Sequence, residues 1–300
     1  MIRLRPMVVM PVIAGSAMTV QAAYDCMAQD VDPQLLILYK GKERQMLENL
    51  NWLEIKYDSR LRVIRHEFSS LAATWNFGLE ECWRGGCSEA LVVNNDVRLW
   101  PGTFGLLSAV RHAMDAMLVS GVNTGKDFYK VDWAKHGPEL LASAAQGTLT
   151  PGGPDFSCFV MSRECHEKYR FDEGFAPAYA EDLDLHRRMM LAGDGRKIFG
   201  VPVPYDHIDG GSGTLKNLSP AGRTRLEEQV ERVSRKYYER KWGGPVNQER
   251  FRAPFGGTMI QVPPSETTTP DLQREVWTKK ESTTEPFGFS GFRTPVESGS

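Results

Sequence analysis

The chain has 300 residues, of which 41% are hydrophobic and 25% charged, and a formal net charge of −2. This composition is typical of a soluble globular chain that forms one sizeable domain or two small ones. The balanced charge offers no general surface for polyanions, so nucleic acid is not indicated as a partner. Five cysteines without a CxxC pair argue against a disulfide framework or a structural zinc site and favour a reducing, cytoplasmic location.

The first apolar run, residues 7–13, has two interpretations. Arg3 and Arg5 followed by MVVMPVIAGSAM have the outline of a secretory signal peptide. However, Pro11 interrupts the run, and the same residues match a buried first strand of an α/β sheet, which is the interpretation we favour. No run approaches the ~20 apolar residues of a membrane-spanning helix, so the sequence indicates no membrane span.

The first hundred residues alternate between apolar runs and helical patterns. The predicted strands are residues 7–13, 35–39, 61–65 and 90–93, and the predicted helices are 17–29 and 74–84. This alternation predicts a parallel sheet with helices on both faces. Sheets of this kind bind ligands at the carboxyl ends of their strands.

The second half predicts a helix over residues 104–119, a strand over 156–161 and a helix over 181–192. The thirty residues after 119 show no clear pattern. Ser219-Pro220 is a good start for a long helix that ends at Trp242, with Leu226, Val230, Val233 and Tyr237 on one apolar face. Beyond about Val262 the composition shifts to Pro, Ser, Thr, Glu and Gly, which predicts disorder or a segment held by a partner.

An acidic pair, Glu181 and Asp182, opens the helix over residues 181–192. Asp182 and Asp184 point roughly 200° apart on a helix, so only one of them can face a given cleft. Asp182 is a candidate general base whose pKa the neighbouring carboxylate of Glu181 helps to tune. The alternative is that acids in a first turn simply complement the helix dipole.

Three further features have both a functional and an ordinary interpretation. Asn94, Asn95 and Asp96 stand where a buried strand stops, and Asp96 either binds Mg²⁺ or Mn²⁺ or belongs to a plain turn. His207 either completes an oxygen-rich Mn²⁺ site or is a hydrogen-bonded structural residue. The glycine-rich turn with Ser212 either wraps a diphosphate or is a flexible loop.

The order of these features is more informative than any one of them. Along the chain stand NFG at 76–78, LVVNNDV with PG at 101–102, FDEGFAPAYAEDLDLHRRMMLAG, YDHIDGGSGT and YYERKWGG. In this order they resemble the inverting glycosyltransferases of family 2, which have the GT-A fold. The resemblance covers roughly residues 7–245. It implies an α/β, Rossmann-like, mostly parallel sheet flanked by helices and closed by a C-terminal helix.

The same resemblance implies the domain organisation. Residues 1–245 form one glycosyltransferase domain, with a nucleotide-binding half at 1–100 and an acceptor half at 101–245. An extended or disordered tail, 246–300, follows.

The resemblance also assigns roles to residues. It makes Asp182 the catalytic base, places Glu181 on the acceptor side, and gives Asp96 and His207 a divalent cation, Mn²⁺ or Mg²⁺. The residues it implies for donor binding are Asn76, Asn94, Asn95, Asp96 and Ser212. The implied donor is a nucleoside-diphosphate sugar, and the acceptor is a hydroxyl of a glycan, a protein or another molecule.

The chain departs from the family pattern at two places. Many members carry a D-x-S motif after the second strand, where it contacts the nucleotide base, but this chain has YKGK at 39–42, so a UDP donor cannot be assumed. The metal motif has one acid, Asp96, rather than two. Three alternatives therefore stay open: an inactive nucleotide-sugar-binding module, a sugar nucleotidyltransferase, although the loop AGSA at 14–17 is a poor phosphate loop, and a tethering role for the tail.

Overall fold

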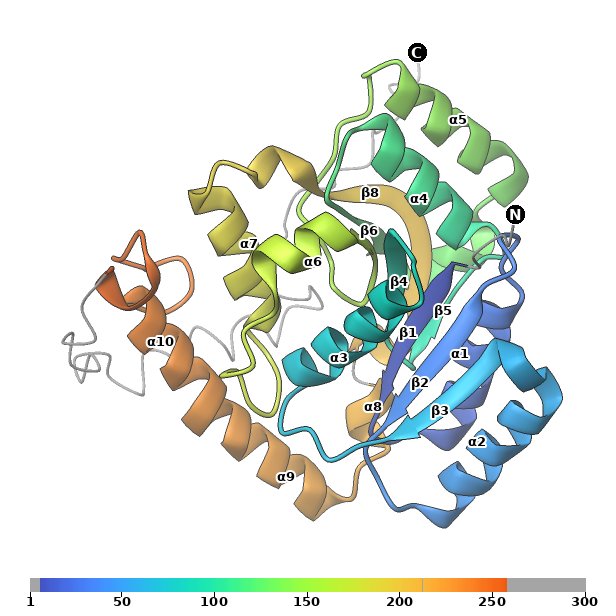
Figure 1. The fold of residues 1–300 in the computed structure, drawn as a ribbon, viewed down its shortest axis with the longest axis horizontal. Helices are drawn as coiled ribbons and strands as arrows, with labels where there is room; N and C mark the ends of the chain where they lie inside the picture. Colours follow the sequence, from blue (N-terminus) through green and yellow to red (C-terminus); the bar gives the residue numbers. More distant parts are fainter. Residues whose placement is uncertain (1–5, 212, 258–300) are drawn as a thin grey trace.

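The computed structural model describes residues 6–211 and 213–257, which form an eight-stranded mixed sheet with helices on both faces (Figure 1). The order of the strands in the sheet is β3-β2-β1-β4-β7-β6-β8-β5. The strands are β1 Met7–Val12, β2 Gln34–Tyr39, β3 Leu61–Arg65, β4 Glu89–Val93, β5 Val97–Arg98, β6 Leu118–Asn123, β7 Cys158–Ser162 and β8 Ile198–His207.

The helices fill the connections between these strands. They are α1 Ser16–Met27, α2 Arg44–Tyr57, α3 Leu71–Arg84, α4 Thr103–Ala113, α5 Trp133–Ala145, α6 Arg163–Tyr169, α7 Glu181–Leu191, α8 Gly213–Lys216, α9 Pro220–Gln229 and α10 Lys236–Trp242. Short helical turns are η1 Asp58–Arg60, η2 Gly125–Lys130, η3 Gly195–Lys197, η4 Ile208–Gly211, η5 Val230–Arg235 and η6 Pro254–Gly256. No helix among the described residues is long and apolar enough to cross a membrane.

The predicted α/β class and its first four strands are confirmed. β1 pairs in parallel with β2 and β4, and β2 pairs in parallel with β3, so the carboxyl ends of these four strands lie at one edge of the sheet. β7 then runs antiparallel to both β4 and β6, and β8 runs parallel to β6. The sheet is therefore parallel in its first half and mixed in its second.

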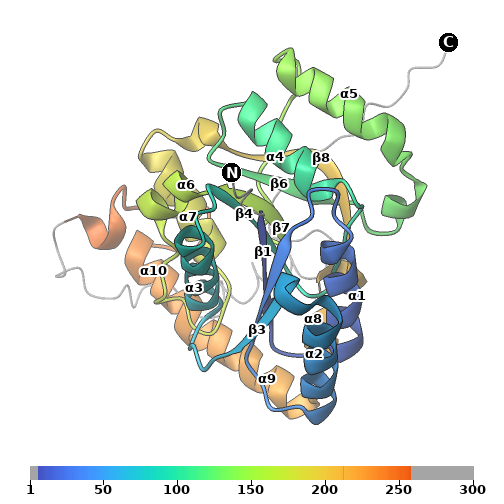
Figure 2. The same cartoon turned by 45° about the vertical axis from the view of Figure 1, so that its right-hand side comes forward.

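Side chains alternate between the two faces of each buried strand, as the period of two requires. Val8, Met10 and Val12 pack with α1, α2, α4 and α5 in one buried cluster, whereas Val9 packs with α3, α6 and α7 in the other. Figure 2 shows α1 and α2 on one side of the sheet and α3, α6 and α7 on the other. Burial on both faces is the reason that these strands are almost continuously apolar in sequence.

The predicted helix over residues 104–119 is too long. α4 ends at Ala113, Asp115 adopts the left-handed region with φ of 50°, and Leu118 begins β6. Residues 118–120 pair with β7, a partner more than thirty residues further along the chain. A short apolar run fits a helix or a buried strand equally well, and this pairing decides between them.

The long helix predicted after Ser219 is confirmed as the continuous segments α9, η5 and α10. Ser219 caps it by accepting a hydrogen bond from the N–H of Gly222 at 3.1 Å. The predicted apolar face is wrong at Val233, which is 43% exposed, while Ser234 is buried. The reason is that η5 is a π-helical turn, whose wider spacing rotates the following side chains relative to an α-helix.

A small separate cluster attaches this helix to the rest of the protein. Phe175 and Ala180, from the loop before α7, pack with Tyr238 and Trp242 of α10. Residues 246–257 follow α10 and fold back on it, since the N–H of Phe251 donates to the carbonyl of Trp242 at 2.9 Å. The remainder of the expected tail, 258–300, lies outside the described residues.

Candidate active site

The turn after β4 is anchored by Asn95, which is buried. Its amide Nδ2 donates to the carbonyl of Ala14, after β1, at 2.7 Å and to Thr19 Oγ1, on α1, at 2.8 Å. Its Oδ1 accepts from the hydroxyl of Thr214, on α8, at 3.1 Å. Asn95 therefore fixes the turn to three other segments, and its amide makes its contacts within the protein.

Asp96 and His207 meet because β5 pairs antiparallel with β8. This pairing places Val97 opposite His207, and the N–H of Ile208 donates to the carbonyl of Asp96 at 2.8 Å. As a result Asp96 Oδ1 lies 3.0 Å from His207 Nε2, although the two residues are 111 positions apart. Asp96 Oδ2 accepts from the N–H of Thr214 at 2.9 Å and from its hydroxyl at 3.0 Å.

The electrostatics of this pair favour a carboxylate beside a protonated imidazole. Burial by itself would raise the pKa of Asp96, but hydrogen bonds from His207 and Thr214 lower it below its usual value. Burial opposes the charge on His207 in the same way, and the hydrogen bond to Asp96 raises the pKa of its imidazole instead. Asp96 is 2% exposed, so the attraction between the two groups is weakly screened.

A divalent cation of the Mn²⁺ or Mg²⁺ type fits this pair. A carboxylate oxygen and an imidazole nitrogen are ligands that Mn²⁺ accepts. Asp96 Oδ1 and His207 Nε2 are 3.0 Å apart, which is a hydrogen-bonding distance, so a cation that binds both atoms has to displace the proton between them. In the described part of the chain no group of three or more His, Cys, Asp or Glu side chains is arranged to hold an ion. A cation here would take its remaining ligands from water or from a bound molecule.

The predicted acidic pair opens α7, as expected. Ala180 precedes it in the left-handed region with φ of 73°, so the backbone turns sharply into the helix. Asp182 is half-buried and its Oδ1 accepts from the N–H of Leu183 at 2.7 Å. Glu181 is 3% exposed, and its Oε2 has no hydrogen-bond partner among the residues that the structure describes.

Burial raises the pKa of both carboxyl groups above its usual value. Burial is the main reason that the pKa of Asp182 is raised to about 6, and the charge of Asp155 adds to it. The pKa of Glu181 is raised well above its usual range by burial and by the charge of Asp182. At neutral pH we therefore expect an ionised Asp182, able to accept a proton, while burial favours the neutral form of Glu181 beside it.

Asp184 points away from this pair and has a structural role. It is fully buried, and it contacts Arg188 Nε at 2.8 Å, Lys241 Nζ at 2.7 Å and Trp242 Nε1 at 3.0 Å. Lys241 also pairs with Asp172, in the loop before α7. These contacts hold α7 against α10, and they engage the Asp184 carboxylate within the protein.

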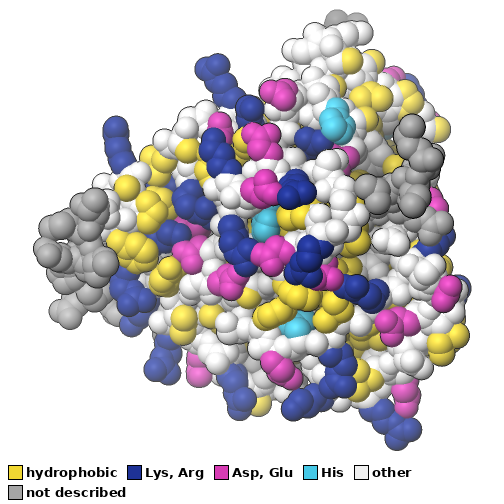
Figure 3. Space-filling view, in the orientation of Figure 1, with side chains coloured by type: hydrophobic (Ala, Val, Ile, Leu, Met, Phe, Trp, Pro, Cys, Tyr) yellow, Lys and Arg dark blue, Asp and Glu magenta, His cyan; other side chains and the backbone are white. Residues whose placement is uncertain are grey.

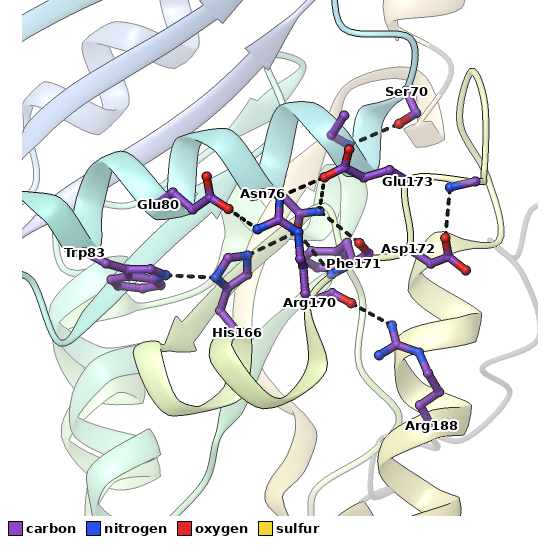
Figure 4. Close-up of polar contacts among 12 residues, drawn as sticks. Ser70, Asn76, Glu80, Trp83, His166, Arg170, Phe171, Asp172, Glu173 and Arg188 are labelled. Carbon is purple, nitrogen blue, oxygen red and sulfur yellow. Dashed lines mark hydrogen bonds and ion pairs between the residues drawn. The ribbon is translucent and has the colours of Figure 1, made fainter. Parts of the chain in front are cut away.

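Asn76 lies in a buried network rather than at the edge where Asp96 stands (Figure 4). Its Nδ2 donates to the carbonyl of Phe171 and to Glu173 Oε1, both at 2.9 Å, and its Oδ1 accepts from the N–H of Phe171 at 3.1 Å. His166 Nε2 lies 3.1 Å from the same oxygen. Asn76 is fully buried and its amide is engaged within the protein, so its side chain is not exposed to a donor.

The same network fixes the tautomer of His166. The indole N–H of Trp83 can only donate, and it lies 3.0 Å from His166 Nδ1, so the imidazole proton is on Nε2 and is donated to Asn76. Burial lowers the pKa of His166 to about 4, which keeps the ring neutral. The network thus holds the start of the loop that leads to Glu181.

The remaining predicted donor residues are placed as follows. Asn94 is half-buried, and its N–H donates to the carbonyl of Ser157 at 2.9 Å. Ser212 lies outside the described residues. The glycine-rich turn next to it closes over Asp96 through Thr214, and a Cβ built on Gly213 would lie only 3.1 Å from the Asp96 Cβ.

Sequence reasoning missed Asp155. It stands in the turn PGGPD before β7, and its charge acts on both Asp182 and His207. The available sequence signal was a turn-forming segment that ends in an acid directly before a buried strand.

The surface of the protein carries mixed charges. On the face that Figure 3 shows, acidic and basic side chains are interspersed, in agreement with the balanced net charge of −2.

Comparisons with known proteins find similar solved structures but no related sequence family. No protein-family model matches, and no curated protein is found as a relative. The chain is similar to glucosyl-3-phosphoglycerate synthase from Mycobacterium tuberculosis in complex with Mn²⁺, UDP and glucosyl-3-phosphoglycerate, with 14% identity over 75% of this chain and 77% of that chain and a TM-score of 0.48. It is also similar to S. aureus TarS 1-349, with 12% identity over 75% of this chain and 70% of that chain and a TM-score of 0.49.

Proposed function

We propose that this protein is a metal-dependent inverting glycosyltransferase, which moves a sugar from a nucleoside-diphosphate donor to an acceptor hydroxyl. The observation that carries the proposal is the Asp96–His207 pair, whose Oδ1 and Nε2 lie 3.0 Å apart at the edge where β4 ends. Polar groups at the carboxyl ends of parallel strands are the usual ligand-binding site of such sheets. The order of motifs along the chain supports the same proposal.

Asp96 and His207 would hold the cation. A bound Mn²⁺ or Mg²⁺ supplies Lewis-acid stabilisation of the charge that develops on the diphosphate leaving group. Thr214 holds the Asp96 carboxylate in place through hydrogen bonds from its N–H and its hydroxyl, and Asn95 fixes the turn on which Asp96 stands. Asn94 and Ser212 remain our predicted donor contacts.

Asp182 would act as the general base. With a pKa of about 6 it is mostly ionised at neutral pH, yet it is basic enough to take the proton from the acceptor hydroxyl as that oxygen attacks the anomeric carbon. Attack from the side opposite to the diphosphate inverts the configuration at that carbon. Glu181 stands beside Asp182 on the acceptor side, where burial favours its neutral form, which can donate a hydrogen bond.

The residues at the end of β2 and directly after it do not specify which nucleobase the donor carries. Tyr39 is buried and its hydroxyl accepts from the N–H of Glu43 at 3.0 Å, while Lys40 Nζ donates to the carbonyl of Phe68. We place the protein in a reducing compartment such as the cytoplasm, a proposal supported by five cysteines that are buried as thiols.

Thermal unfolding with Mn²⁺ and UDP, GDP, dTDP or CMP tests the donor side of this proposal, because a ligand that binds the native state raises the midpoint. We expect a metal-dependent shift with one nucleoside diphosphate. Incubation with the corresponding nucleotide sugar should then release sugar slowly to water, with the inverted anomer detected by NMR.

Other results would support the alternatives. Release of diphosphate from a nucleoside triphosphate would indicate a nucleotidyltransferase, and binding without any sugar release or transfer would indicate a binding module. A folded protein that binds none of these nucleotides would refute the proposed function.

A further inference from the structure

Asp155 is held rigidly at the same edge of the sheet as Asp96. Its N–H donates to Ser120 Oγ, on β6, at 2.7 Å, and its Oδ1 accepts from the N–H of Ser157 at 2.9 Å. The neighbouring Phe156 is buried in the cluster with α3. The backbone of Asp155 is therefore held against β6, and its carboxylate is oriented by the N–H of Ser157.

The pairing of β4 with β7 brings this carboxylate to the turn that carries Asp96. The antiparallel ladder ends with Val93 opposite Cys158, and one further hydrogen bond joins the N–H of Asn94 to the carbonyl of Ser157 at 2.9 Å. The chain before Ser157 thus runs beside residues 94–96, and Asp155 lies next to that turn.

Asp155 lies near both parts of the candidate active site, the base Asp182 and the turn that carries Asp96. Burial raises the pKa of Asp182, and the Asp155 carboxylate raises it further. The Asn94–Ser157 hydrogen bond places Asp155 beside the turn that carries Asp96. Asp155 therefore lies near both the metal pair and the base, and the sugar of a nucleotide-sugar donor has to lie in this region.

A second buried group beside Asp155 lacks a partner. Tyr205 is fully buried and lies two residues before His207 on the same face of β8, with ring centroids 6.4 Å apart. Its phenol lies close enough to the Asp155 carboxylate to interact with it. By strict hydrogen-bond geometry its hydroxyl has no partner among the described residues, and a buried hydroxyl without a partner is costly.

We propose that Asp155 and Tyr205 form the subsite for the hydroxyl groups of the transferred sugar and restrict the donor to neutral sugars. The proposal rests on the proposed function. A carboxylate accepts hydrogen bonds from sugar hydroxyls, and these charge-assisted hydrogen bonds are stronger than those between neutral groups. It also repels a second carboxylate, so a uronic acid in the same position is disfavoured.

Calorimetric titration in the presence of Mn²⁺ tests this subsite. The ligands are UDP, UDP-glucose and UDP-glucuronic acid. If the wild type binds guanosine nucleotides instead, the ligands are GDP, GDP-mannose and GDP-mannuronic acid. The wild type should bind the neutral sugar nucleotide more tightly than the acidic one. Asp155→Asn should weaken binding of the neutral sugar nucleotide about 10- to 100-fold, with little change for the nucleotide alone. The same variant should also show a smaller difference in affinity between the neutral and the acidic sugar nucleotide.

Two further variants control for folding and charge. Tyr205→Phe removes one hydroxyl, keeps the ring, and should weaken only the sugar nucleotide. Asp127→Asn makes the same change as Asp155→Asn at a side chain that is 73% exposed, and it should alter neither affinity. Thermal unfolding of each variant shows whether it is folded.

Three results would overturn the subsite. Equal weakening of nucleotide and sugar nucleotide by Asp155→Asn would make the residue part of the metal site or of the fold. Unchanged binding of the sugar nucleotide in Asp155→Asn and Tyr205→Phe would remove both residues from the sugar site. A wild type that binds no nucleotide would refute the proposed function and this proposal with it.

Discussion

Replacement of Asp182 by asparagine should stabilise the protein while it abolishes transfer. The pKa of Asp182 is raised from 3.8 to about 6, mainly by burial, so the folded protein disfavours the charged form. Each unit of pKa corresponds to about 1.36 kcal/mol, which gives an upper limit of about 3 kcal/mol for this shift. The charge of Asp182 also raises the pKa of Glu181, so the two contributions overlap. We therefore expect a gain in unfolding free energy of about 2 kcal/mol at pH 8.

The pH dependence of this gain is a sharper test than its size. The folded protein holds the Asp182 proton more tightly than the unfolded chain does, so the carboxyl stabilises the fold at low pH and loses that contribution as the pH rises from about 4 to about 6. The unfolding free energy of Asp182→Asn minus that of the wild type should be near zero below pH 4. It should increase between pH 4 and pH 6 and stay constant above pH 7.

Asp184→Asn is the matched control, because it makes the same chemical change on the same helix. Asp184 is fully buried and contacts Arg188, Lys241 and Trp242 at 2.7 to 3.0 Å. Removal of its charge leaves the buried ammonium of Lys241 with less compensation, and we expect a loss of about 3 kcal/mol. The two variants should therefore change stability in opposite directions.

Thermal and urea unfolding from pH 4 to pH 8 measure these differences. For a chain of this size about 1 kcal/mol moves the midpoint by about 2–4 °C, so Asp182→Asn should raise it by about 4–8 °C at pH 8. Transfer should fall by about 10²- to 10⁴-fold, with nucleotide binding retained. A variant that is less stable than the wild type at pH 8, or a difference that does not depend on pH, would refute our account of Asp182.

Three further predictions concern other groups of the site. The turnover rate should rise with pH through an apparent pKa near 6, measured in a pH–rate profile, and a flat profile over pH 5–7 would argue against Asp182 as the base. His207→Ala should remove the effect of Mn²⁺ on nucleotide binding, measured by calorimetry with and without EDTA, whereas retained metal dependence would exclude His207 as a ligand. Asn76→Ala should lower the unfolding free energy by about 2–4 kcal/mol, because it leaves the buried backbone of Phe171 and the proton of His166 without partners, while metal-dependent nucleotide binding persists.

The sequence by itself determined the four parallel strands of the first half of the fold, but not α2 or β5. β1, β2 and β4 are buried on both faces, and such strands need nearly continuous apolar side chains, which are visible without a structure. The start of α7 was equally clear, because its acids lie where the helix dipole favours them. The angle between residues two apart on a helix also showed that Asp182 and Asp184 could not share a role.

Tertiary structure decided what depends on contacts between distant segments. The run at residues 118–120 became strand β6 because it pairs with β7, and Val233 turned outward because a π-helical turn rotates the helix. Asn76 was placed in a buried network by Phe171, which is 95 positions away. Periodicity and local propensity describe neighbours along the chain, so they carry no information about such partners.

The site shows the same division. Residue types alone left both a functional and an ordinary interpretation of Asp96, Asp182 and His207, and the resemblance in the order of the motifs favoured the functional one. Only the antiparallel pairing of β5 with β8 brought Asp96 within 3.0 Å of His207, and only the ladder between β4 and β7 brought Asp155 beside them. The chemistry of each side chain is set by its own residue, whereas its neighbours are set by how the whole sheet packs.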